Sequence, residues 1–189
     1  MSVHGIALPW LMLIDMQRVF GEPGSPWFTP GFDNASRAAL RLRDAFGPRV
    51  ALTRFIPPAE PQGSWIEYYK RSSFALDPAN AGLFELVSAF PATGTEVIDR
   101  PTFSKWDAEV GPRLGSPAEI VLAGVSTDCC VLATALGAVD AGIHVRIAAD
   151  ACAGTNAGSH HCALDVMALY APQIEITSVD AVLATHRPG

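Results

Sequence analysis

The sequence predicts one α/β domain over residues 1–189, with a Rossmann-like, doubly wound parallel sheet of six strands and helices on both faces. Short apolar runs rich in Val, Ile and Leu, typical of strands buried on both faces, alternate with segments of helical hydrophobic period. The chain has no internal repeat, and its 49% of hydrophobic residues suffice for one sizeable core. This succession favours strands joined by right-handed helical crossovers.

The first strand, residues 8–16, is a nearly continuous apolar run that carries Asp15 near its carboxyl end. Ligands of open α/β sheets bind at that edge, so Asp15 is a candidate functional carboxylate. The alternative is a residue that caps the next turn. Residues 17–31, rich in Gly, Pro and aromatic side chains, are expected to form a loop. Residues 33–46 repeat apolar positions at helical spacing and end at Gly47, which predicts a crossover helix.

The second strand is expected at residues 49–55 and the third at 96–99, directly before Arg100. Between them, residues 56–80 form a long irregular insertion with several prolines and aromatic residues. Insertions of this length in a compact domain are often functional, which makes it a candidate lid or interface segment. Residues 84–90 are expected to form a short helix.

A turn of small residues connects the fourth strand to a helix. An apolar run from residue 119 ends at Gly124, and Cys129 and Cys130 then lead into an Ala-rich helical pattern that ends near residue 141. Unpaired N–H groups and the dipole at a helix start favour negative charge, so a thiol there is expected to have a lowered pKa. The alternative is a cysteine that only packs. The other expected elements are a short helix at 106–114, strands at 143–149 and 174–177, and a helix at 160–170.

Composition argues against several classes of partner. The net charge is −6, and the 13 basic residues are scattered, so no nucleic-acid partner is expected. No apolar run reaches the roughly 18 residues of a membrane span, and no targeting pattern opens the chain, so a cytoplasmic protein without a membrane partner is expected. The four cysteines lack the spacing of zinc ligands or of a disulfide framework and are expected to be free thiols.

Three reactive side chains fall at the carboxyl ends of different strands: Asp15, Arg100 and Cys130. Together they provide what nucleophilic catalysis needs. A thiolate attacks, a carboxylate takes the thiol proton and returns it to the leaving group, and a cation balances the charge.

These residues and their surroundings resemble the isochorismatase-like cysteine hydrolases, a family that includes nicotinamidases, N-carbamoylsarcosine amidohydrolase and ureidoacrylate amidohydrolases. The matching segments are Leu-Ile-Asp-Met-Gln at 13–17, Arg-Pro-Thr-Phe-Ser-Lys-Trp at 100–106 and Gly-Val-Ser-Thr-Asp-Cys-Cys-Val at 124–131, followed by Thr134, Ala135 and Gly142. The resemblance covers most of the chain. It implies a sheet in the order 3-2-1-4-5-6 and an Asp-Lys-Cys catalytic set.

The resemblance also implies individual roles. Asp15 is expected to be the acid/base and Cys130 the nucleophile, with Cys129 structural. A cis peptide is expected between Val125 and Ser126, with the Ser126 and Cys130 N–H groups forming the oxyanion hole.

The sequence departs from the family pattern at two places. The family lysine at the end of strand three is replaced by Arg100, so the cation is expected to be Arg100, with Lys105 as the alternative. The metal-binding histidines of nicotinamidases have no counterpart around strand two, so neither a metal nor another cofactor is expected.

The retained thiol favours hydrolysis of a C–N bond in a small amide, carbamoyl or ureido compound through a thioester on Cys130. Phe20, Trp65 and Trp106 are candidate walls of the substrate pocket, and a homodimer or homotetramer is expected. Two alternatives stay open: an isochorismatase-type hydrolase, and a weak or inactive member that serves as a binding module. A dinucleotide-binding Rossmann protein has no support, because no glycine-rich loop follows the first strand.

Overall fold

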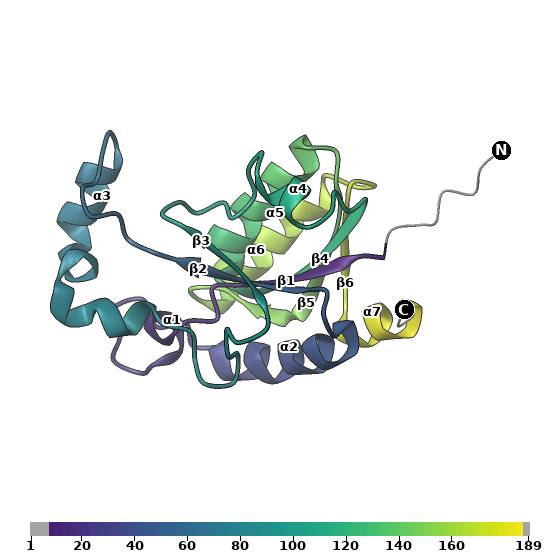
Figure 1. Ribbon diagram of the computed structural model, residues 1–189, viewed down its shortest axis with the longest axis horizontal. Helices are drawn as coiled ribbons and strands as arrows, with labels where there is room; N and C mark the ends of the chain where they lie inside the picture. The colour runs from purple at the N-terminus through teal and green to yellow at the C-terminus, as the bar shows by residue number, and fades with distance from the viewer. Residues whose placement is uncertain (1–7, 187–189) are drawn as a thin grey trace.

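The computed structural model describes residues 8–186 and contains one all-parallel sheet in the order β3-β2-β1-β4-β5-β6 (Figure 1). The predicted fold class, strand number and strand order are therefore confirmed. The strands are β1 (Trp10–Ile14), β2 (Val50–Phe55), β3 (Glu96–Arg100), β4 (Glu119–Val125), β5 (His144–Ala153) and β6 (Ile174–Thr177).

Two hydrophobic cores lie on opposite faces of the sheet. Side chains alternate along β1, so Leu11 and Leu13 enter one core while Met12 and Ile14 enter the other. Figure 1 shows that helices cover the sheet both from below and from above. The first core packs against α2 (Phe32–Phe46) and α7 (Val179–Thr185), and the second against α4 (Val110–Arg113), α5 (Leu132–Asp140) and α6 (Ala157–Ala168). Both faces of the sheet are covered, which explains the continuous apolar runs.

The segment between β2 and β3 contains more helix than expected. The predicted irregular insertion includes α3 (Trp65–Arg71) and the 3-10 helices η1 (Ser73–Leu76) and η2 (Pro78–Phe84). Figure 1 shows α3 standing away from the sheet, beyond the carboxyl ends of β1 and β2.

The prediction of a helix at residues 84–90 is wrong. The backbone of this segment forms hydrogen bonds with the chain that follows β1: Val87 N–H donates to the Met16 carbonyl at 3.0 Å, and the Glu85 carbonyl accepts from Arg18 N–H at 2.9 Å. The neighbouring segment was expected to be a loop, and it includes the short helix α1 (Arg18–Gly21). No helix within residues 8–186 is long and apolar enough to cross a membrane.

Candidate active site

The candidate site lies at the carboxyl edge of the sheet, where β1 and β4 are neighbours and the strand order reverses direction. Crevices at such a reversal are the usual ligand sites of open α/β sheets. Asp15 follows β1 directly. Cys130 belongs to η3 (Thr127–Val131), a π-helical turn between β4 and α5.

Gly124 allows the two strands to approach at this point. It pairs with Ile14 in the β1–β4 register and has a φ of 118°. A Cβ atom there would lie 2.2 Å from the Ile14 carbonyl oxygen, so no larger residue fits. The following Val125–Ser126 peptide is cis, as predicted.

Asp15 is fully buried and is held by the neighbouring strand β2. Its N–H donates to Thr53 Oγ1 at 3.1 Å, and the Thr53 hydroxyl donates to Asp15 Oδ1 at 2.7 Å. Asp15 adopts a φ of 51°, a left-handed conformation that Asp tolerates better than most residues. Its other oxygen, Oδ2, accepts no aligned hydrogen bond from residues 8–186 but lies 3.1 Å from Lys105 Nζ.

Lys105 is the cation that meets Asp15. Its side chain is fully buried, and its ammonium group donates to the Thr102 carbonyl at 2.7 Å and lies 4.7 Å from the centre of the Phe55 ring. The backbone N–H of Lys105 donates to Thr134 Oγ1 at 2.9 Å, and the Thr134 hydroxyl donates to the Cys130 carbonyl at 2.6 Å. Thr134 thus ties the loop that carries the lysine to the turn that carries the thiol.

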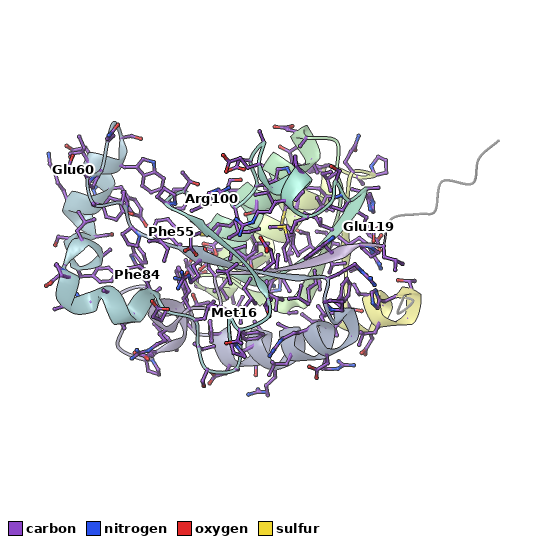
Figure 2. All side chains as sticks on the ribbon, in the orientation of Figure 1. Met16, Phe55, Glu60, Phe84, Arg100 and Glu119 are labelled. Carbon is purple, nitrogen blue, oxygen red and sulfur yellow. The ribbon has the colours of Figure 1, made fainter. Side chains whose placement is uncertain are left out.

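The expectation that Arg100 pairs with Asp15 is wrong. Arg100 ends the edge strand β3, where it pairs with Phe55 in register, and Figure 2 labels both side chains. Its guanidinium bonds to Asp107 at 2.6 Å and lies 3.3 Å from Glu109, both of which are exposed. Because β3 is an edge strand, Arg100 can pair with carboxylates on the outer surface of the protein. Lys105 lies in the loop that follows β3, and its side chain reaches Asp15 at the end of β1 instead.

Cys130 is buried, with 4% of its surface exposed. Hydrogen bonding with the Cys129 thiol, burial and the negative charge of Asp15 raise the pKa of the Cys130 thiol well above its usual range, although Lys105 opposes the shift. The expectation of a lowered pKa for Cys130 is therefore wrong, because burial beside a carboxylate outweighs the start of the helix. The same hydrogen bond lowers the pKa of the more exposed Cys129.

A cavity of about 300 Å³ opens onto the two thiols. Its eleven lining residues are Phe20, Pro26, Trp27, Phe28, Phe55, Tyr68, Phe103, Ser126, Cys129, Cys130 and Thr155. Both predicted oxyanion-hole residues, Ser126 and Cys130, are therefore at the cavity, while their role stays a prediction.

The three predicted pocket walls have different positions. Phe20 lines the cavity. Trp65 stands behind it, with its ring centroid 4.8 Å from that of Phe103. Trp106 is buried in the core of the opposite layer and does not line the cavity.

Sequence reasoning missed most of the aromatic wall. Trp27 is its centre, with ring centroids at 5.0–6.1 Å from five other aromatic side chains: Phe20, Phe55, Tyr68, Phe74 and Phe84. The available signal was the gathering of aromatic residues in the segments that follow β1 and β2. Because these segments converge only in the folded chain, their order in sequence does not show which rings meet.

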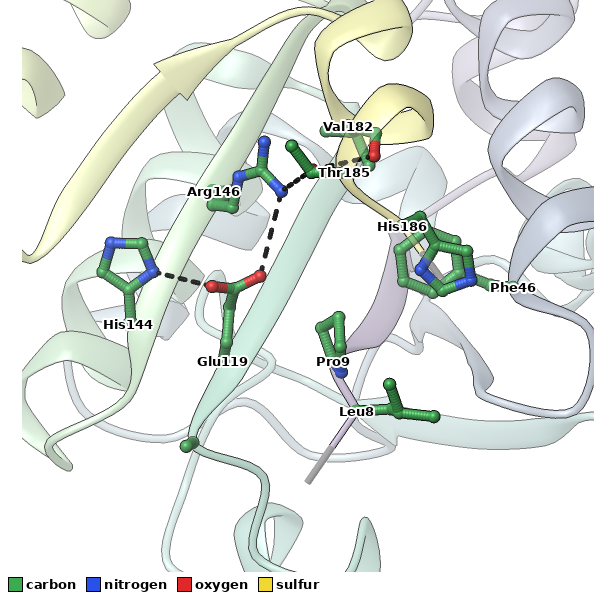
Figure 3. Close-up of a pocket in the computed structure, with 10 residues that line it drawn as sticks. Leu8, Pro9, Phe46, Glu119, His144, Arg146, Val182, Thr185 and His186 are labelled. Carbon is green, nitrogen blue, oxygen red and sulfur yellow. Dashed lines mark hydrogen bonds and ion pairs between the residues drawn. The ribbon is translucent and has the colours of Figure 1, made fainter. Parts of the chain in front are cut away.

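A larger hollow of about 740 Å³ lies at the opposite, amino edge of the sheet (Figure 3). Four of its polar side chains form pairs: His144 Nδ1 lies 3.2 Å from Glu119, and Arg146 donates to Thr185 at 3.0 Å. His186 stacks on Phe46, with ring centroids 4.0 Å apart. No cysteine lines the hollow. Size alone therefore does not select a candidate site. The carboxyl edge is the candidate because Asp15 and Lys105 meet there near the thiols.

The donor groups at the carboxyl edge do not suggest a metal centre. Within the described residues, no group of three or more His, Cys, Asp or Glu side chains is placed to hold a metal ion. His160 in α6 bonds to Thr127 Oγ1 of the η3 turn at 2.8 Å.

The model of the isochorismatase domain matches residues 9–180. Among solved structures, a cysteine hydrolase from Pseudomonas syringae pv. phaseolicola 1448A superposes with a TM-score of 0.81 at 18% identity, covering 93% of this chain and 91% of that one. An isochorismatase-like hydrolase from Alkaliphilus metalliredigens gives 0.78 at 16% identity, covering 97% and 99%. The MAR1 ribonuclease from Caenorhabditis elegans gives 0.71 at 20% identity, covering 97% and 83%.

At these identities the solved structures establish a shared fold, and the names of the proteins differ in the activity they state. The family model, in contrast, spans most of the chain, including Asp15, Lys105 and Cys130. The chain therefore belongs to the isochorismatase family of hydrolases.

Proposed function

We propose that this protein is a cytoplasmic cysteine hydrolase that cleaves the C–N bond of a small amide, carbamoyl or ureido compound through a thioester on Cys130. The observation that carries the proposal is the buried ion pair between Asp15 and Lys105. Asp15 Oδ2 lies 3.1 Å from Lys105 Nζ, at the crevice that also holds Cys130. Oδ2 has no aligned donor among residues 8–186, which leaves it able to accept the thiol proton.

The reaction proceeds in two halves. Asp15 takes the proton from the Cys130 thiol as sulfur attacks the carbonyl carbon, and the N–H groups of Ser126 and Cys130 stabilise the oxyanion. Asp15 then returns the proton to the leaving nitrogen, and the C–N bond breaks to leave a thioester. In the second half Asp15 deprotonates a water molecule, which attacks the thioester carbonyl. The C–S bond then breaks to release the acid, and Asp15 returns the proton to the Cys130 sulfur, which regenerates the thiol.

The raised pKa of Cys130 fits this sequence of steps. A thiol that stays protonated at rest needs a general base beside it, and the effect of the Asp15 charge on the pKa of Cys130 supports Asp15 as that base. Lys105 is held by the Thr102 carbonyl and by Asp15. Its positive charge balances the negative charge that moves between Asp15 and Cys130 during the reaction. The alternative of a weak or inactive binding module was suggested by the presence of Arg100 in place of the family lysine. Because Lys105 lies beside Asp15, the site has a lysine after all, which favours the hydrolase over that alternative.

Two further expectations remain part of the proposal. The cysteines within residues 8–186 are all free, which suits a reducing compartment such as the cytoplasm. Self-association as a homodimer or homotetramer is supported by exposed apolar side chains at the end of α6 and just beyond it: Val166, Leu169 and Tyr170.

The test is a screen of small amides and ureides with purified protein, with the Cys130→Ala variant as the blank. We expect ammonia or amine release that depends on Cys130, together with a mass increase on the Cys130 peptide equal to the acyl group when the reaction is quenched early. Turnover that persists in the Cys130→Ala variant contradicts the proposal.

A further inference from the structure

The cavity above the thiols is aromatic and carries no charge. Six of its eleven lining residues are Phe, Trp or Tyr, and none is Lys, Arg, His, Asp or Glu. The polar side-chain groups of the lining residues are the two thiols, the hydroxyls of Tyr68, Ser126 and Thr155, and the indole N–H of Trp27. At about 300 Å³ it is at the small end of ligand pockets.

Two arginines close in sequence to lining residues, Arg18 near Phe20 and Arg54 beside Phe55, are paired with other groups. Arg18 pairs with Glu22 and donates to the Gly82 carbonyl. Arg54 pairs with Asp99 and Glu85.

The cation nearest to the reacting thiol is also engaged, because Lys105 is held by Asp15 and the Thr102 carbonyl. A substrate carboxylate among the aromatic rings would find no positive partner. Desolvating an unpaired carboxylate costs several kcal/mol, more than a small ligand can recover from apolar contact.

The ring of Tyr68 has a defined position in this wall. It packs against Trp27 and Phe103, with ring centroids at 6.1 and 5.6 Å, and against Trp65 and Tyr69 on its own helix at 5.1 and 5.2 Å. Neighbours on several sides restrict the ring, so the direction of its hydroxyl is restricted as well.

The Tyr68 hydroxyl is also available for a ligand. Among residues 8–186 no hydrogen bond to it is formed, and Tyr68 lines the same cavity as Cys129 and Cys130. Burial, with smaller contributions from Cys129, Tyr69 and Cys130, raises the pKa of Tyr68 well above its usual range. The group is therefore a protonated donor at neutral pH.

We infer that the substrate is an uncharged amide whose flat apolar group lies among the aromatic rings, and that the Tyr68 hydroxyl donates the hydrogen bond that orients it. This inference rests on the proposed function of the site and narrows its substrate class. Tyr68 is a specificity-determining residue, and anionic amides of similar size are excluded by the missing cation.

The first test measures binding by calorimetry to the Cys130→Ala variant, which cannot turn over. The probes are benzamide and 4-carbamoylbenzoate, which differ by one carboxylate. We expect benzamide to bind at least tenfold more tightly. Equal binding, tighter binding of the anion, or binding of neither probe overturns the inference.

Turnover by the wild-type protein is scored separately. Benzamide that binds selectively but is not hydrolysed contradicts the proposed function and leaves the inference intact. Hydrolysis of 4-carbamoylbenzoate in preference to benzamide contradicts the inference and leaves the proposed function intact.

The second test compares Tyr68→Phe with Tyr69→Phe, each in the Cys130→Ala background. Tyr69 is the matched control because it neighbours Tyr68 in α3 and does not line the cavity. We expect Tyr68→Phe to weaken benzamide binding about five- to tenfold, the range of one hydrogen bond, and Tyr69→Phe to leave it unchanged. With Cys130 present, the loss is expected in KM more than in kcat. Equal affinities of the two variants overturn the role of Tyr68.

Discussion

Lys105 Nζ lies 3.1 Å from Asp15 Oδ2, and both side chains are fully buried. The pair joins the end of β1 to the loop that follows β3, across the crevice that holds Cys130. A buried ion pair of this kind contributes little net stability, because the desolvation of both charges offsets their attraction. Its value here is to hold a carboxylate and a cation beside a thiol.

Substitution of Lys105 or of Arg100 tests which of the two is the cation that assists acylation of Cys130. We expect Lys105→Met, which keeps most of the side-chain volume, to slow acylation of Cys130 by about a hundredfold or more in single-turnover measurements. It should also lower the free energy of unfolding by about 3–5 kcal/mol, because Asp15 is left buried without its partner. Arg100→Ala is the control: its ion pairs are at the surface, and we expect acylation to change little. The reverse pattern would show that Arg100 is the functional cation.

Thr53 is the second support of Asp15, since its hydroxyl both receives the Asp15 N–H and donates to Oδ1. We expect Thr53→Val to lower kcat about tenfold and the free energy of unfolding by about 1–3 kcal/mol, as buried polar atoms lose their partner. Thr53→Ser retains the hydroxyl and should stay near wild type in urea unfolding and in turnover. A Thr53→Val protein with unchanged kcat would show that Asp15 needs no such support.

The two adjacent thiols should respond differently to pH. A raised pKa keeps Cys130 as a thiol at neutral pH, so its alkylation should accelerate as pH rises toward that pKa. The lowered pKa of Cys129 places its thiolate at lower pH, so iodoacetamide should modify Cys129 first at pH 7. Peptide fragmentation by mass spectrometry distinguishes the two positions. Faster labelling of Cys130 at pH 7 would contradict the assigned shifts.

Tyr69 carries a buried hydroxyl that has no hydrogen-bond partner within residues 8–186, and 2% of the residue is exposed. Removing an unpaired buried polar group while keeping the ring should be favourable. We expect Tyr69→Phe to raise the free energy of unfolding by about 1 kcal/mol, measured by urea denaturation. A loss of stability would indicate that the hydroxyl has a partner such as a bound water molecule.

Gly124 tests the contact between β1 and β4. Because an added Cβ would meet the Ile14 carbonyl at 2.2 Å, we expect Gly124→Ala to destabilise the fold by more than about 3 kcal/mol. Gly82→Ala is the control, since the nearest atom to its added Cβ is an arginine nitrogen at 3.6 Å. Similar unfolding midpoints for the two variants would mean that the strands can separate at no cost.

The sequence by itself determined the fold class and the placement of two candidate reactive groups. A strand buried on both faces must be continuously apolar, so the six strands stand out from segments of helical period. Polar residues that directly follow such strands must lie at one edge of a parallel sheet. Asp15 and Cys130 were therefore predicted together from local sequence.

Only the tertiary structure decided which cation joins them and which rings form the pocket. Arg100 and Lys105 are both close in sequence to the end of β3, but their directions depend on the edge position of that strand and on the path of the returning loop. The aromatic wall likewise comes from segments after β1, β2 and β3, and residues 84–90 lost their expected helix to hydrogen bonds with the chain after β1. Contacts between segments distant in sequence set these features, and no local pattern of hydrophobicity or propensity encodes them.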